Sequence, residues 1–181
     1  MASWPQIARR IRVPLGFGFA VLYVWLAQPT SLSILAGGCL ALPGLVMRGI
    51  ASGHVTKNEQ LTMSGPYAYV RNPLYLGSLV LAAGFAVAAR SWVIVIVMAV
   101  MFAAVYLPVI RSEEVFLRQK FPKYEEYSRH VPRLLPRFTA FGNACGTFSR
   151  ELYWKHREYN AILGVALMIA ALVAKMRWLS R

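Results

Sequence analysis

Long runs of apolar side chains constrain this chain more than any other feature. They cover residues 13–26, 31–47, 73–89, 92–110 and 161–174. The third and fourth runs are near or slightly below the roughly 20 residues that a helix needs to cross a bilayer. Because backbone groups in hydrocarbon must bond within their own segment, each run is predicted to be a helix. The sequence therefore predicts an all-α integral membrane protein with about five transmembrane helices.

Composition supports the membrane class and limits the partners. Of 181 residues, 57% are hydrophobic, and the mean hydropathy is +0.47; soluble domains are roughly half apolar. The net charge is +13, from 20 Lys and Arg against 7 acidic residues, all of them Glu. Because apolar spans separate the basic clusters, lipid headgroups are favoured over nucleic acid as their partner. With 2 cysteines and 3 separated histidines, neither a disulfide framework nor a metal site is expected.

The first apolar run follows Arg9, Arg10 and Arg12, so it resembles either a signal peptide or a first membrane span. No small-residue cleavage site is evident, which favours a retained span. The second run begins directly after residues 28–30, as in a tight helical turn. Residues 1–47 are therefore expected to form an N-terminal two-helix membrane hairpin.

Lys and Arg residues predict the orientation of the spans. They are concentrated before the first run, in residues 48–71 and in residues 111–157, whereas the turns at 28–30 and 90–91 hold one between them. With four spans, all the basic regions lie on one side, which is expected to be cytoplasmic, at the inner or plasma membrane if the protein is bacterial. The last run, 161–174, could cross the bilayer or lie on its surface; crossing would export the basic residues that follow it.

The polar segment before the third run contains the motif SGPYAYVRNPLYLG, residues 64–77. Composition alone indicates an aromatic belt, with Tyr67 and Tyr69, and a snorkelling Arg71 at the membrane surface. The same motif can also form one side of a binding pocket. Pro73 fits the first turn of the third helix, where its missing N–H is not needed. Free N–H groups at that helix start could bind an anion such as a carboxylate.

A second motif follows the fourth run: RSEEVFLRQKFPKYEEYSRHVPRLLPRF, residues 111–138. Most of its charges fit a solvated amphipathic helix with Glu–Arg pairs one turn apart. Glu113 and Glu114 are notable because the chain holds only 7 acids and these two are adjacent at a membrane boundary. Arg133 and Arg137 lie beside two prolines, which fix their direction. This segment is therefore the second candidate for a functional site.

The two motifs together resemble the isoprenylcysteine carboxyl methyltransferase family and its phospholipid methyltransferase relatives. The resemblance lies in residues 64–77 and 113–137 and extends over residues 48–138. It implies an integral membrane methyltransferase that uses S-adenosylmethionine without a Rossmann domain and accepts a lipid-like acceptor from the bilayer. The helical hairpin of residues 73–110 and a cytoplasmic C-terminal segment, residues 139–181, would enclose the cofactor, and the latter would end in a membrane or interfacial helix.

The resemblance also assigns individual positions. The residues that match the family are Tyr67, Arg71, Pro73, Tyr75 and Gly77 in the first block and Glu113, Glu114, Tyr127, Arg133 and Pro136 in the second. Position 72 is Asn where the family usually has His, and Asn can hydrogen-bond a cofactor but has no titrating imidazole. The loop before the first block often holds a polar or His residue in this family. The implied cofactor contacts are His54, Tyr67, Arg71, Asn72, Pro73, Tyr75, Gly77, Glu113, Glu114 and Arg137.

The chemistry of S-adenosylmethionine agrees with these residue types. It presents a carboxylate, an ammonium, a sulfonium and an adenine, so its site needs a cation or helix N-terminus, an acid and a stacking surface. Methyl transfer is an in-line displacement, for which positioning and desolvation supply most of the acceleration. Arg71 or Arg133 would steer an anionic acceptor, and Glu114 would hold the cofactor's ammonium or a cationic acceptor. S-adenosylhomocysteine would be the product, and the acceptor could be a carboxylate, an amine or a thiol.

Two other functions remain open at this stage. Membrane sterol and steroid reductases are similar in their C-terminal architecture and bind NADPH there, and the many arginines could hold its 2′-phosphate. A non-enzymatic helical scaffold that binds anionic lipid explains the composition but not the clustered Tyr, Arg and Glu. Gly16 and Gly18 lack the third glycine and the strand of a dinucleotide-binding fingerprint.

Overall fold

The computed structural model describes residues 4–56, 60–142 and 144–179. Within α1, the side chains of four residues lie outside that description: Pro5, Arg9, Arg12 and Val13. Every regular element of the described residues is helical, which confirms the all-α prediction. The elements are α1 (Trp4–Leu26), α2 (Ser31–Ser52), η1 (Gly65–Ala68), α3 (Pro73–Ala89), α4 (Trp92–Met101), η2 (Phe102–Tyr106), α5 (Leu107–Lys120), α6 (Tyr124–His130), α7 (Arg150–Lys155) and α8 (Tyr159–Leu179).

Three helical stretches are long and apolar enough to cross a membrane: α2, α8 and the continuous rod of α4, η2 and α5 (Trp92–Lys120). α3 and the Pro14–Leu26 part of α1 are shorter apolar helices. These five helices correspond to the five predicted runs. The sequence left open whether residues 161–174 cross the bilayer or lie on its surface. α8, which contains them, has the length and hydropathy that a crossing requires. The apolar run ends at residue 110, but the helical backbone of the rod continues through charged residues to Lys120.

α2 and α3 pack through facing glycines, here called the α2–α3 seam: Gly37 against Gly84 and Gly44 against Gly77. A Cβ added at Gly44 would lie 2.6 Å from the Gly77 carbonyl oxygen, and one added at Gly77 would lie 2.7 Å from that of Gly44. In lipid the hydrophobic effect does not drive helix association, so close backbone approach through small residues takes its place. The seam therefore fixes the centre of the bundle.

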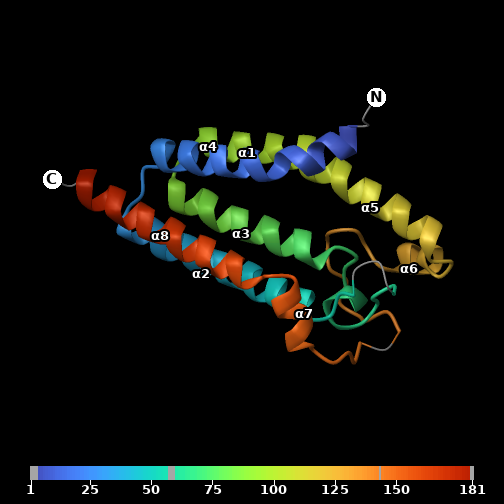
Figure 1. Ribbon diagram of the computed structural model, residues 1–181. Helices are drawn as coiled ribbons and strands as arrows, with labels where there is room; N and C mark the ends of the chain where they lie inside the picture. The colour runs from blue at the N-terminus through green and yellow to red at the C-terminus, as the bar shows by residue number, and fades with distance from the viewer. Residues whose placement is uncertain (1–3, 57–59, 143, 180–181) are drawn as a thin grey trace.

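α1 and α2 follow each other through the short segment 27–30, but α1 does not pack along α2. α1 instead lies against the rod of α4, η2 and α5, and α2 lies against α3 and α8. Figure 1 shows the result: α1 runs beside α4, α8 runs beside α2, and α3 lies between the two pairs. The local reason is that Ala8 is fully buried against Val105 and Val109 of the rod, whereas the glycines of α2 match those of α3.

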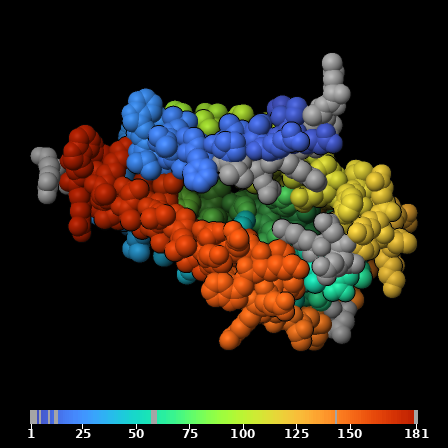
Figure 2. All heavy atoms as spheres, viewed as in Figure 1, coloured from blue at the N-terminus to red at the C-terminus, as the bar shows by residue number. Residues whose placement is uncertain are grey.

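α8 is held to the bundle by polar contacts at its two ends. At the C-terminal end, the Lys175 ammonium donates to the carbonyls of Val24 and Trp25 at 2.7 and 2.6 Å, where the last carbonyls of α1 need donors. Just before α8, Glu158 accepts two hydrogen bonds from one nitrogen of Arg48, at 2.7 and 2.9 Å. Between these ends the helix stands apart from α1. Figure 2 shows a furrow between the two helices with α3 in its floor.

The polar segments gather at one end of the bundle (Figure 1), where η1, α6 and α7 lie. Backbone hydrogen bonds join the two motif blocks directly: Arg71 N–H to the Pro132 carbonyl at 2.9 Å and Arg137 N–H to the Tyr69 carbonyl at 3.0 Å. A cluster of buried residues around Tyr124 stabilises this arrangement. The two blocks, far apart in sequence, therefore face each other across the end of the membrane helices.

Candidate functional site

A cavity of about 570 Å³ lies between the two motif blocks. The predicted site residues that line it are Tyr67, Arg71, Asn72, Pro73, Tyr75 and Glu113. Leu74, Phe116 and Leu117 add apolar walls. Its size falls within the range of roughly 300–1,000 Å³ that is usual for small-molecule sites. The cavity therefore combines charged, aromatic and apolar surfaces at the end of the membrane helices.

The buried carboxylate of Glu114 is held by two arginines. Arg133 donates from Nη2 at 2.6 Å and from Nε to both carboxylate oxygens at 3.0 Å, and Arg71 Nη1 lies 3.5 Å away. The side chain of Asn72 donates to the same carboxylate at 3.2 Å. The Glu114 bonds raise the pKa of Arg133, so that side chain stays cationic. Two guanidinium groups on one carboxylate leave this cluster with a net positive charge.

Glu113 has a different environment, although it is adjacent to Glu114 on α5. Successive helical residues point about 100° apart, and Glu113 lines the cavity. Its carboxylate accepts a hydrogen bond from the Tyr75 hydroxyl at 3.2 Å. Among the ion pairs formed by the described residues, none involves Glu113. Glu113 is therefore the acid of the pair that can meet a cationic ligand, whereas Glu114 is engaged by Arg133.

Among the described residues that line the cavity, Arg71 is the cation. Its Nη1 contacts the Tyr124 hydroxyl at 3.4 Å as well as Glu114, but its buried Nε has no hydrogen-bond partner among the described residues. A buried donor without a partner costs free energy that a ligand acceptor can recover. α3 begins beside it with Pro73 in its first turn and no side-chain cap, so the positive end of that helix also adjoins the cavity. Both features favour a negatively charged group.

Three buried tyrosines form the aromatic wall. The Tyr127 hydroxyl donates to the Tyr67 carbonyl at 2.7 Å, which ties α6 to η1. Burial raises the pKa of Tyr67 and Tyr127 above the usual tyrosine value. Burial and the nearby Glu114 carboxylate also raise the pKa of Tyr124, and Arg71 opposes this shift. All three phenols therefore remain protonated and apolar-faced at neutral pH.

Four of the predicted cofactor contacts lie away from the cavity lining: Glu114, described above, and His54, Gly77 and Arg137. The His54 ring bonds the carbonyls of Ile50 and Gly146, at 2.8 and 3.2 Å, and lines a separate, smaller cavity. Gly77 faces α2 in the seam, so the group that approaches its backbone is another helix. Arg137 donates to the His130 carbonyl and to the Thr139 hydroxyl, both at 2.9 Å. These residues position the walls of the site.

Sequence reasoning missed the contribution of α1, which brings Gln6 to the cavity. The first turns of α1 are fixed by Trp4, whose indole N–H donates to the Ala104 carbonyl at 2.9 Å. Pro108 cannot donate the usual helical bond to that carbonyl, and the helix forms a π turn there. Thr56, whose buried hydroxyl has no partner among the described residues, was also missed. Pro108 was the available signal, but the donor that serves the Ala104 carbonyl is Trp4, 100 residues away from Ala104.

Comparisons with known proteins show which family this chain resembles. The phospholipid methyltransferase family matches residues 45–124, which include the first block, α3, the rod and the two adjacent acids. The described residues thus form a helical membrane protein with a charged cavity at one end. The family match and the similarity to an isoprenylcysteine methyltransferase support the isoprenylcysteine carboxyl methyltransferase-like family that the motifs predicted.

Individual relatives cover the chain in part. It is 39% identical over 85 residues to the cobalt-zinc-cadmium resistance protein CzcN of Cupriavidus metallidurans, covering 47% of this chain and 39% of that protein. It is 31% identical to the nickel-cobalt-cadmium resistance protein NccN of Alcaligenes xylosoxydans xylosoxydans, covering 68% and 60%. It is 27% identical to the protein-S-isoprenylcysteine O-methyltransferase of Schizosaccharomyces pombe, covering 74% and 59%. The chain thus spans between 39% and 60% of their lengths. No solved structure matches the chain at a significant level.

Proposed function

We propose that this protein is an S-adenosylmethionine-dependent methyltransferase that acts on a lipophilic acceptor at the membrane interface. The observation that carries the proposal is the cavity between the motif blocks, which presents a carboxylate without an ion-pair partner among the described residues, Glu113, and a cation with an unused donor, Arg71. S-adenosylmethionine carries both signs of charge in one molecule. The family match supports the same activity.

The residues present fit the cofactor group by group. Glu113 can hold a cationic group, the ammonium or the sulfonium, because its carboxylate lines the cavity. Arg71 and the N-terminus of α3 suit the carboxylate of the methionine part. Tyr67, Tyr124 and Phe116 offer faces for the adenine. The volume of about 570 Å³ accommodates a ligand of this size with space for the reacting end of an acceptor.

The bound cofactor would supply a methyl group activated by its sulfonium. The chain's own residues position the reactants and exclude water, which is how methyl transfer is accelerated. Glu114 acts through its neighbours. It neutralises Arg133, orients the Arg71 side chain and accepts a hydrogen bond from Asn72. Asn72 needs no titration for this task, so the departure from the family's usual His is compatible with the site. Arg71 remains available to an anionic acceptor as well as to the cofactor.

The acceptor would reach this site from the bilayer. Part of α3 is visible in the furrow between α1 and α8 (Figure 2), and α3 begins at the cavity. A carboxylate, amine or thiol on a lipid-like or isoprenoid chain fits this path, and Arg71 or Glu113 would select among them by charge. We place the cavity on the cytoplasmic side, because the basic segments gather there.

Equilibrium binding to the detergent-solubilised protein tests the proposal. Titrations with S-adenosylmethionine, S-adenosylhomocysteine and NADPH should show binding of the first two only. Binding of NADPH alone would support the reductase class, and binding of none of the three would support a non-enzymatic scaffold. Transfer of a labelled methyl group to extracted membrane lipids would then identify the acceptor.

A further inference from the structure

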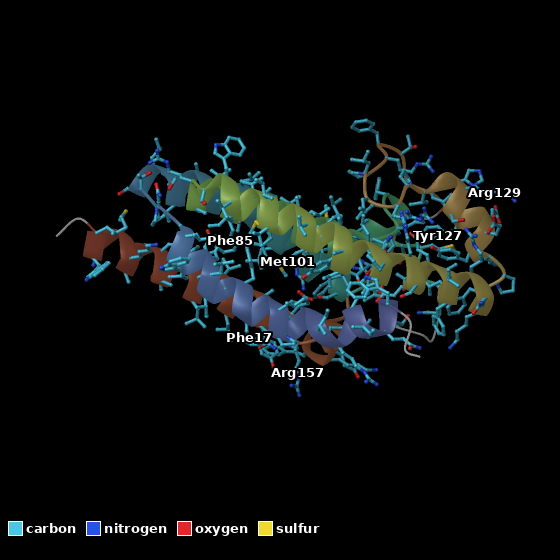
Figure 3. All side chains as sticks on the ribbon, turned by 90° about the horizontal axis from the view of Figure 1, so that it is seen from above. Phe17, Phe85, Met101, Tyr127, Arg129 and Arg157 are labelled. Carbon is cyan, nitrogen blue, oxygen red and sulfur yellow. The ribbon has the colours of Figure 1, made fainter. Side chains whose placement is uncertain are left out.

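The loop between α6 and α7 exposes large apolar side chains outside the membrane helices. Phe138 is 102% exposed and Leu135 is 78% exposed. Single exposed apolar residues are common, but two within four residues of a polar segment mark a site of contact. Figure 3 shows this loop standing out to one side of the bundle, beyond Tyr127 and Arg129. These side chains therefore point away from the cavity and the core.

The backbone of this loop is fixed at the level where a membrane helix begins. The Arg137 N–H bonds the Tyr69 carbonyl at 3.0 Å, and the Phe141 N–H bonds the Ala68 carbonyl at 2.9 Å. Tyr69 lies only a few residues before Pro73, the first residue of apolar α3. The loop thus runs beside the end of a hydrophobic helix, where headgroups meet acyl chains.

The loop and the last turn of α6 carry the basic side chains Arg137 and Arg129, whereas the acids Glu125 and Glu126 lie in the first turn of α6. Arg137 donates only to a backbone carbonyl and a hydroxyl, and no carboxylate of the described residues pairs with it. Arg129 is 73% exposed and shares Glu125 with Arg118. Basic side chains beside exposed apolar ones complement a membrane surface with anionic headgroups. Neutral lipid offers the apolar contact without the charge contact.

We propose that residues 134–138 form a headgroup loop, which inserts Leu135 and Phe138 into the lipid interface while Arg137 binds the phosphates of anionic lipids. The loop is continuous with residues 131–133, which border the Glu114 cluster, so its insertion would hold the site against the membrane surface. This inference does not depend on methyltransferase activity. It would stand if S-adenosylmethionine failed to bind.

Spin-label accessibility in nanodiscs tests it. The protein would carry a nitroxide at Leu135→Cys, with Cys39 and Cys145 replaced by Ser, in phosphatidylcholine with or without phosphatidylglycerol. A label at Lys123→Cys, in the exposed turn between α5 and α6, is the control. We expect a water-soluble nickel complex to reach position 135 several-fold less than position 123, and oxygen to reach it more. Adding phosphatidylglycerol should increase this difference.

Second-site variants sharpen the result. Phe138→Ser should raise nickel access at position 135 toward that at 123, whereas Phe138→Leu should leave it unchanged. Arg137→Gln should remove the effect of phosphatidylglycerol. Because Phe138 is fully exposed, neither Phe138 variant should alter helicity, which circular dichroism would verify. Equal nickel access at positions 135 and 123 in both lipid mixtures would overturn the proposal, as would equal behaviour of Phe138→Ser and Phe138→Leu.

Discussion

The α2–α3 seam and the polar end of the molecule differ in how completely they are packed. In the seam, four glycines bring two backbones so close that no added carbon fits. At the polar end, tyrosines, arginines and acids enclose a cavity of about 570 Å³ and leave buried donors such as Arg71 Nε without partners among the described residues. The seam is optimised for packing, whereas the polar end retains unused hydrogen-bonding capacity. Binding capacity in this fold is therefore expected where packing is incomplete.

The largest effect should come from breaking the seam. In Gly84→Leu, the new Cβ alone would lie 2.7 Å from Ala41 Cβ, on a neighbouring helix that cannot move aside cheaply. Overpacking typically costs about 1–3 kcal/mol and occasionally more, and this Cβ would also clash with backbone atoms of Gly37 and Ala41, so the thermal midpoint in detergent should fall steeply. Gly164→Leu on α8 is the matched control, because a Cβ there meets nothing within 4 Å. Equal midpoints for the two variants would show that the seam does not hold the bundle.

The next largest effect should come from the charge cluster at the polar end. Glu114→Gln leaves Arg71 and Arg133 facing each other without their shared carboxylate. We expect a loss of roughly 1–3 kcal/mol in the free energy of unfolding, measured by chemical denaturation in detergent. Glu125→Gln removes an exposed carboxylate with two arginine partners and should change stability by less than about 1 kcal/mol. Similar losses for both would mean that burial of Glu114 contributes little.

The polar end should also lose stability at alkaline pH. The pKa of Tyr67 and of Tyr127 is raised by burial, so the folded phenols stay protonated where those of the unfolded chain ionise, above about pH 10. The unfolded state then binds fewer protons than the folded state, and stability falls as pH rises. Denaturation midpoints between about pH 8 and pH 11 measure this slope. In Tyr127→Phe the slope should be shallower; an unchanged slope would place its origin elsewhere.

The smallest effect should come from the hydrogen bond that joins the start of α1 to the π turn of the rod. Trp4→Phe removes the indole N–H that serves the Ala104 carbonyl of the π turn and should cost about 1 kcal/mol. Trp92→Phe, at a residue that is 82% exposed, is the control and should be neutral in detergent. The difference between their thermal midpoints reports the contribution of this bond. A larger loss from Trp92→Phe would contradict the assignment.

The apolar pattern predicted the helices better than it predicted their partners. Residues 73–89 were expected as a helix and form α3, since a proline and a turn mark its ends. The packing partners of α1 and α2 were not predicted, because glycine pairing between α2 and α3 is a property of two segments and periodicity within one segment does not reveal it. Gly77 illustrates this, because a glycine at that position indicated that some group approaches its backbone closely. It did not indicate that this group is α2.

The sequence predicted which two segments meet at the site, but not which side of each helix faces the cavity. The two motifs were expected to meet, and hydrogen bonds between them join Arg71 to Pro132. Which of two adjacent acids faces the cavity depends on the rotation of α5, and spacing does not give that angle. The sequence hypothesis therefore expected Glu114 to bind the cationic group of the ligand. In the structure the Glu114 carboxylate binds Arg133, and Glu113 lines the cavity.

Calorimetric titration of S-adenosylmethionine into the wild type and into the Glu113→Gln and Glu114→Gln variants compares the two neighbouring acids directly. Loss of a charge-assisted contact at Glu113 should weaken binding by roughly 10–100-fold while leaving the thermal midpoint nearly unchanged. Glu114→Gln should lower the midpoint as well as the affinity. If Glu113→Gln binds S-adenosylmethionine as tightly as the wild type, or if the wild type does not bind it, the cavity is not the cofactor site.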